Sequence, residues 1–136
     1  MRKIMSLAVG VLLGGATLCC LAEAEKSLGP TMKEILGSVT ALKKDLDAKN
    51  GAEAEKESKK LEGLFKDVEK FWAARKTEDA VKFSKDSQKE AAEVGKAAKA
   101  GNFEKALTAH GEIGKNCQGC HTAHREKLPD GGFKIK

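Results

Sequence analysis

Four stretches of this sequence repeat apolar residues at the spacing of one helix face, and residues typical of turns separate them. This periodicity limits the fold more than any other feature, because a chain patterned in this way buries its apolar stripes by packing helix on helix. With six aromatic residues in 136, the chain also lacks the usual strand formers. The expected helices open at 29–31 and stop near 49–51, cover about 52–75 and 78–100, and run from 103 to a turn at 129–132.

Local signals mark the expected helix ends. Thr31 and Glu34 fit a capping box, Thr77 can cap the third helix, and Asn102 can cap the fourth. Gly101 suits the left-handed position that follows a helix. After the turn at 129–132, we expect the basic tail 133–136 to be mobile.

The apolar stripes predict which residues form the core. On the third helix the stripe consists largely of small residues, which would let a neighbouring backbone approach closely. The short loops favour an all-α, antiparallel four-helix bundle with a thin core. The stripes are Met32, Ile35, Leu36, Val39, Leu42 and Leu46; Leu61, Leu64, Phe65, Val68, Phe71 and Trp72; Val81, Ser84, Gln88, Ala91, Ala92, Val94, Gly95 and Ala98; and Phe103, Ala106, Leu107, His110, Ile113, Gly114, Cys117, Cys120 and His121.

The N-terminus has the pattern of an export signal. Arg2 and Lys3 precede an uncharged, largely apolar stretch, and residues 22–24 supply the small-x-small pattern of a cleavage site. We therefore expect residues 1–24 to be a cleaved signal peptide and residues 25–136 to form the mature domain in the periplasm. A retained membrane helix and a lipid anchor on Cys19 or Cys20 are the alternatives, and we expect no stable membrane insertion after cleavage.

Charge excludes some classes of function. The formal net charge of +5 is spread along helix faces without interleaved aromatic residues, so we expect no nucleic-acid site. No nucleophile, acid–base pair or phosphate loop stands out, so we expect no enzyme activity.

Residues 117–121 read Cys-Gln-Gly-Cys-His, the C-x-x-C-H pattern of covalent c-type haem attachment. On a helix, Cys117, Cys120 and His121 fall within an arc of about 100°. Two thiols can then join the vinyl groups at one porphyrin edge while the imidazole reaches the iron. The pattern thus predicts one covalent haem c, with His121 as an axial ligand.

Other sites can be built from the same residues. Cys117, Cys120, His121 and His124 have the atom types of a zinc site, but they are crowded into eight residues. A thioredoxin-type dithiol would need a βαβ context, and a disulfide between Cys117 and Cys120 would strain a helix.

The mature chain resembles the class II c-type cytochromes, the cytochrome c′ and cytochrome c-556 group. That family has four antiparallel helices, and its motif C-x-x-C-H-x-x-aromatic-Arg is matched here by Cys117, Cys120, His121 and Arg125. His124 stands where an aromatic residue is usual, which bears on the packing around the proximal ligand.

The resemblance leaves two states open for the other face of the iron. In the c-556 group a Met from the first helix is the sixth ligand, and residues 31–34, Thr-Met-Lys-Glu, resemble that region. Met32 is also the single methionine beyond residue 24 and lies on the apolar stripe. We therefore expect Met32 to ligate the iron, and the alternative is that Met32 is ordinary core and that the iron is five-coordinate, as in cytochromes c′.

Three further residues have less specific expectations. His110 shares a helix with His121, so it is a poor sixth ligand and is expected to be a hydrogen-bonded core residue or a haem-edge contact. His124 is expected at the haem edge or in solvent. Arg125 can pair with a haem propionate or face solvent.

The sequence therefore predicts a periplasmic electron carrier that meets redox protein partners through lysines around the haem edge. The alternative is a five-coordinate cytochrome c′ that binds NO or CO. The resemblance is also compatible with a homodimer formed through the first two helices.

Overall fold

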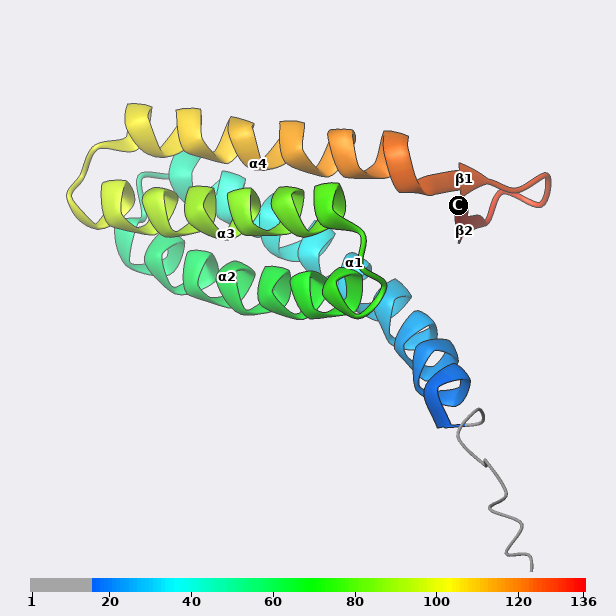
Figure 1. Cartoon of the computed structure of the whole chain (residues 1–136). Coiled ribbons are helices and arrows are strands. Elements are labelled where there is room, and N and C mark those ends of the chain that lie inside the picture. The colour runs from blue at the N-terminus through cyan, green and yellow to red at the C-terminus, as the bar shows by residue number, and fades with distance from the viewer. Residues whose placement is uncertain (1–15) are drawn as a thin grey trace, which may run out of the picture.

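A computed structural model describes the backbone of residues 16–136 and the side chains of residues 28–136. It contains α1 (Ala16–Asp47), α2 (Gly51–Ala74), α3 (Glu78–Lys99), α4 (Phe103–His124), β1 (Arg125–Lys127) and β2 (Phe133–Ile135). The four helices pack against one another: α2 contacts α1 and α3, α3 contacts α4, and α1 contacts α4 more sparingly (Figure 1). The predicted helical bundle is confirmed.

Turn chemistry ends the helices much as expected. The side chain of Asn102 accepts a hydrogen bond from the Lys105 backbone N–H at 3.1 Å, and Gly101 adopts a φ of +76°. Thr77 occupies the N-cap position of α3, but its hydroxyl donates to the Arg75 carbonyl at 3.4 Å instead of capping the helix. The predicted cap at Thr77 was wrong in its side-chain role.

The predicted start of the first helix was also wrong. The helix α1 begins at Ala16 and contains Pro30, so Thr31 and Glu34 lie inside it and form no capping box at its start. A proline inside a helix removes one backbone hydrogen bond at a cost of about 3 kcal/mol, but it does not always end the helix. The residues before Pro30 continue the helix.

The structure describes no side chains in the predicted signal peptide, residues 1–24. Residues 1–15 are not described, and for 16–27 only the backbone is. In the described part of the chain, no helix is both long and apolar enough to cross a membrane.

The core follows the predicted stripes with a few corrections. On α2, Leu61, Phe65, Val68, Phe71 and Trp72 are buried. Leu36 was expected in the core but is 68% exposed, and Ala92 is exposed as well. The periodicity identifies a face, while the neighbouring helix decides how much of that face is covered.

The small residues of α3 allow α2 to approach closely, as predicted. A Cβ atom added to Gly95 would lie 3.1 Å from the Cβ of Ser58 on α2. Ser58 and Gly95 are both buried. This contact brings the two backbones together and leaves little apolar side-chain volume between them.

The fourth helix ends earlier than expected and the tail is ordered. The helix α4 stops at His124, and β1 and β2 form an antiparallel hairpin in which Glu126 pairs with Lys134. Asp130 accepts a hydrogen bond from the Gly132 N–H at 2.8 Å, and Gly131 has a φ of +86°. The expectations of a helix reaching residue 129 and of a mobile tail at 133–136 were therefore wrong, and the all-α description omits this hairpin.

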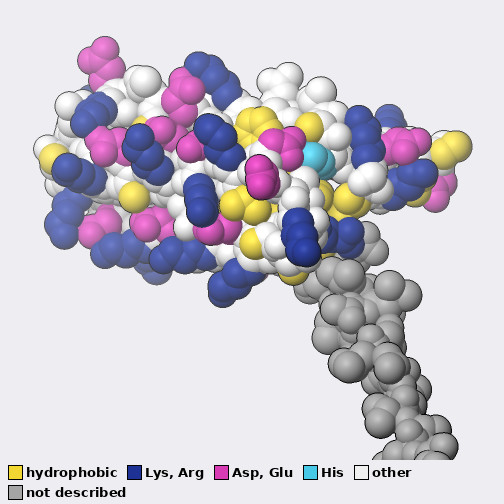
Figure 2. Space-filling view, viewed as in Figure 1, with side chains coloured by type: hydrophobic (Ala, Val, Ile, Leu, Met, Phe, Trp, Pro, Cys, Tyr) yellow, Lys and Arg dark blue, Asp and Glu magenta, His cyan; other side chains and the backbone are white. Residues whose placement is uncertain are grey.

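The surface carries both signs of charge. Lysine and arginine side chains alternate with aspartate and glutamate over the face in Figure 2. Several ion pairs join different helices: Glu55 of α2 pairs with Lys99 of α3 at 3.2 Å, and Glu93 of α3 pairs with Lys105 of α4.

Candidate functional site

One cavity of about 260 Å³ is lined by residues from all four helices. Most of the lining side chains are apolar. The lining residues are Met32, Ile35, Leu36, Val39, Phe65, Val68, Phe83, Ser84, Ser87, Gly114, Asn116, Cys117, Cys120 and His121.

The two cysteines and the histidine of the predicted attachment motif all line the cavity. Cys117, Cys120 and His121 lie on α4, are half-buried and line the cavity together. Both cysteines are free thiols, so the alternative of a disulfide between them is not what the structure contains. Helical spacing directs the three reactive groups to one surface.

Met32 lines the same cavity from α1, a helix far from α4 in the sequence. Its side chain is half-buried and packs against the hydrophobic core. The fold therefore brings the predicted distal residue into the cavity that contains His121. Ligation of iron by Met32 stays a prediction.

The serine side chains in the cavity wall make it less polar than their residue type suggests. Ser84 and Ser87 are buried, and their hydroxyls donate to the carbonyls of Ala80 and Phe83 at 2.8 and 2.9 Å. Because these hydroxyls are bonded to their own helix, the wall offers few free polar groups to a ligand. A flat apolar group is better suited to this wall than a hydrated ion.

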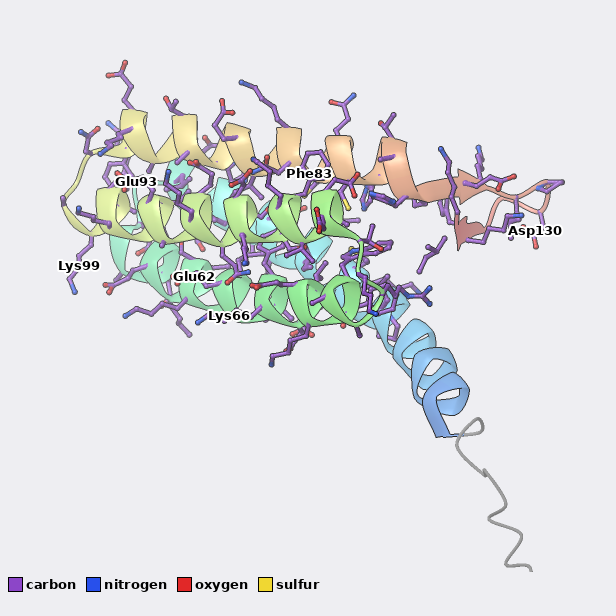
Figure 3. The ribbon with its side chains drawn as sticks, in the orientation of Figure 1. Glu62, Lys66, Phe83, Glu93, Lys99 and Asp130 are labelled. Atoms are coloured by element: carbon purple, nitrogen blue, oxygen red, sulfur yellow. The ribbon has the colours of Figure 1, made fainter. Side chains whose placement is uncertain are left out.

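Phe83 packs directly on the middle of the motif. It lies on the side of α3 that faces α4 (Figure 3), and a Cβ atom added to Gly119 would lie 2.7 Å from Phe83 Cε1. Gly119, the second variable residue of the motif, thus lies where a larger side chain would collide with the Phe83 ring. Phe83 was on no predicted stripe, and sequence periodicity alone gives no signal for this contact.

Burial sets the protonation of the motif side chains. It raises the pKa of the Cys117 thiol, and it raises that of Cys120 to about 11, with smaller contributions from Cys117 and Asp79. Burial, together with the charge of Arg125, lowers the pKa of His121. At neutral pH the imidazole is therefore neutral, which is the form that binds a metal.

His110 is hydrogen-bonded and half-buried, close to the first of its two predicted roles. Its Nε2 atom lies 3.0 Å from the carbonyl oxygen of Val39, so the ring joins α4 to α1. It does not line the cavity.

His124 does not line the cavity and lies mostly away from solvent, and its expected contact with a haem edge stays a prediction. Its side chain is 17% exposed, its Nε2 atom lies 2.8 Å from Oδ2 of Asp79, and its ring centroid is 5.0 Å from that of Trp72. The bond to His124 is the main cause that lowers the pKa of Asp79. No local sequence pattern predicts this contact, because it joins three different helices.

Arg125 is exposed at the start of β1, and its guanidinium lies 3.8 Å from the centre of the Phe133 ring. Contact with a propionate stays a prediction for this residue.

The zinc alternative has no geometric support among the described residues. They contain no group of three or more His, Cys, Asp or Glu side chains that could hold a metal ion. His124, which a four-ligand site would need, is bonded to Asp79.

The donor set fits a haem better than the other candidates. Two thiols, an imidazole and a thioether line one apolar cavity, and these are the groups that attach and ligate haem c. The cavity volume is slightly below the range of about 300–1,000 Å³ usual for small-molecule sites. A group as large as haem would therefore also cover side chains at the edge, such as Leu36.

Comparison with known proteins adds no relative: no family model, no curated protein and no solved structure matches this chain.

Proposed function

We propose that this protein is a periplasmic electron carrier with one covalent haem c in the cavity that all four helices line. The observation that carries the proposal is that Met32 lines the same apolar cavity as Cys117, Cys120 and His121. Haem supplies a reversible one-electron couple when bound. We also propose that the four helices run antiparallel, which the short connections at 48–50, 75–77 and 100–102 support.

Each of the four residues has a distinct role in this proposal. Cys117 and Cys120 form the thioether bonds, and the neutral imidazole of His121 donates to the iron from α4. Met32 donates its sulfur from α1, and a thioether ligand favours a higher reduction potential. Ligands that different helices fix before electron transfer rearrange little during it.

The apolar wall makes the surroundings of the ligands less polar. Ile35, Val39, Phe65 and Val68 supply hydrocarbon surface, and the neighbouring serine hydroxyls are bonded within α3. A dry, apolar surrounding favours the form of a redox centre that carries less charge. We propose redox proteins as partners and no catalytic activity.

A five-coordinate centre that binds NO or CO is the second candidate. Leu36 and Val39 line the cavity within two turns of Met32 on the same helix. If one of these side chains faces the iron instead of Met32, the distal position accepts a small gas. The residue that faces the iron therefore decides between the two functions.

The experiment is Met32→Leu in protein exported by a host with haem attachment machinery. Haem must first resist acid–acetone extraction in the wild type, and its loss on extraction would refute covalent attachment. We then expect wild-type Fe(III) to be low-spin and Met32→Leu Fe(III) to be high-spin, because the change keeps the volume and removes the sulfur. After reduction to Fe(II), Met32→Leu should bind CO more quickly than the wild type.

Ile35→Leu is the matched control, since it changes the same cavity wall without touching a sulfur atom. It should leave the spin state as in the wild type. A wild type that is already high-spin and unaffected by Met32→Leu would favour the gas-binding function instead.

A further inference from the structure

His121, the proposed ligand from α4, lies near the C-terminal end of its helix. The last four carbonyl groups of a helix have no partner within the helix, and helix ends fray. In α4 these carbonyls belong to residues 121–124, so His121 lies in the terminal turn. Only the backbone N–H of Arg125, which donates to the His121 carbonyl, continues the helical pattern there.

The hairpin returns to this turn and supplies the missing donors. The backbone N–H of Lys136 donates to the His124 carbonyl at 3.0 Å, and its Nζ donates to the Thr122 carbonyl at 2.9 Å. Three of the four terminal carbonyls thus have a partner. The pairing of β1 with β2 holds Lys136 close to the helix end from which β1 starts.

A side chain of the same turn is held by two other helices. The His124 ring is bonded to Asp79, in the first turn of α3, and packs on Trp72, which is buried in α2. Trp72 is itself fixed by an edge-to-face contact with Phe71, with ring centroids 5.0 Å apart. The His124 side chain is mostly buried, while that of Asp79 is exposed. The bond to Asp79 and the contact with Trp72 therefore hold the ring from α3 and from α2.

We propose that His124, Asp79, Trp72 and Lys136 form a terminal clamp that positions His121 toward the iron. The inference rests on the proposed haem site, but the clamp contacts are independent of it. His124 and the other clamp residues touch no ligand in this proposal, so they are positioning residues. With the clamp intact, His121 keeps one orientation; without it, the terminal turn frays and His121 samples several.

The experiment compares four single variants and one double variant of the haem-loaded protein. His124→Leu removes the bond to Asp79, His124→Phe keeps an aromatic ring on Trp72, Asp79→Ala removes the partner, and Lys136→Ala removes the Nζ donor. Amide hydrogen exchange at Arg125 reports whether the terminal turn opens. The electron paramagnetic resonance spectrum of Fe(III) reports whether the iron has one ligand geometry or several.

Two controls separate positioning from general stability. Lys134→Ala changes a hairpin lysine that pairs with Glu126 and not with α4. Leu61→Ala creates a void at a fully buried core position that does not line the cavity. All spectra are taken at a temperature where thermal melts show each variant to be fully folded.

We expect His124→Leu and Asp79→Ala to raise the exchange rate at Arg125 several-fold and to split the iron signal into more than one species. Their double variant should add nothing to His124→Leu, because that change already removes the bond that Asp79→Ala breaks. Lys136→Ala should show a smaller effect, His124→Phe should partly restore the single signal, and both controls should resemble the wild type.

A single unchanged iron signal and unchanged exchange in His124→Leu would overturn the clamp. So would an equal response in Leu61→Ala, which would mark the effect as general loss of stability. Haem content distinguishes these outcomes from failure of the proposed function: a wild type without covalent haem refutes the haem site, whereas loaded variants with unaltered spectra refute the clamp alone.

Discussion

Gly119 is the residue at which the attachment motif meets α3. A Cβ atom there would lie 2.7 and 2.8 Å from two atoms of the Phe83 ring, closer than packed carbon atoms come. Phe83 is half-buried and lines the cavity, so its ring can retreat only by changing the cavity wall. The contact couples the identity of a motif residue to the shape of the proposed haem site.

We predict that Gly119→Ala is destabilising, although alanine is the better helix former. The helix preference gains about 1 kcal/mol, while forcing a methyl group into a packed contact costs about 1–3 kcal/mol. Gly111→Ala is the matched control on the same helix, because nothing lies within 4 Å of its Cβ, and it should be stabilising. Denaturant unfolding of both variants measures the difference.

Phe83→Leu in the Gly119→Ala background should recover part of the lost stability, because the smaller side chain leaves room for the methyl group. If Gly119→Ala is as stabilising as Gly111→Ala, then Phe83 moves freely and does not form a fixed wall of the cavity.

The candidate site residues could be predicted from the sequence better than the residues around them. The spacing of Cys117, Cys120 and His121 is local and follows from helix geometry, and Met32 is marked by its place on an apolar stripe. Phe83 and the partners of His124 depend on how separate helices meet. Leu36 shows the same limit, since its spacing fits the core but no helix covers it.

Ion pairs between helices give the bundle an acid-sensitive component. Side-chain bonds to Lys59 and Lys99 lower the pKa of Glu55, and the bond to Lys105 lowers the pKa of Glu93. A carboxylate whose pKa is lower in the folded state stabilises the fold at pH values above its unfolded pKa. That contribution is lost as the pH falls below about 4.5 and through the folded pKa.

We therefore predict that Glu93→Gln reduces the difference in unfolding free energy between pH 7 and pH 3. The variant should be less stable than the wild type at pH 7, and this difference should shrink toward pH 3 as the wild-type carboxyl takes up a proton. Both partners are partly exposed, so the effect is modest and weakens in high salt. Urea unfolding at the two pH values provides the measurement.

Asp47→Asn is the control, because its partner Lys43 lies within the same helix and the pair joins no two elements. A Glu93→Gln variant whose stability differs from the wild type equally at both pH values would contradict the electrostatic explanation and indicate a packing effect.

The helices could be predicted from the sequence, but their ends could be predicted less well. Asn102 and Gly101 mark an end through strong local preferences, and the structure bears them out. Pro30 is a weaker signal than its chemistry suggests, because a helix can continue through a proline at a cost. The Asp130-Gly131 pair is a recognised hairpin signal, so the hairpin could have been predicted from the sequence.

The molecule as a whole has little apolar volume at its centre. The buried residues of α3 are alanines, serines, one glycine and one valine. Around the cavity, Met32, Cys117 and Cys120 are only partly buried, and Leu36 is 68% exposed. Covering one large apolar side chain contributes about 1.5–3 kcal/mol, and a domain is stable by about 5–15 kcal/mol in total. A haem that covers several of these side chains would therefore decide whether the bundle is rigid.

We predict that the haem-free protein, made as the Cys117→Ala/Cys120→Ala double variant, keeps helical secondary structure but loses fixed packing. It should retain most far-ultraviolet circular dichroism, lose the near-ultraviolet signal of Trp72, bind a hydrophobic dye and melt without a sharp transition. Each cysteine loses only its sulfur atom in the double variant, so the sulfur volume alone cannot account for such a change. Loaded wild-type protein is the reference and should melt cooperatively. A haem-free variant that melts as sharply as the loaded protein would contradict this prediction. It would show that the four helices form a sufficient core on their own, in spite of the small residues of α3.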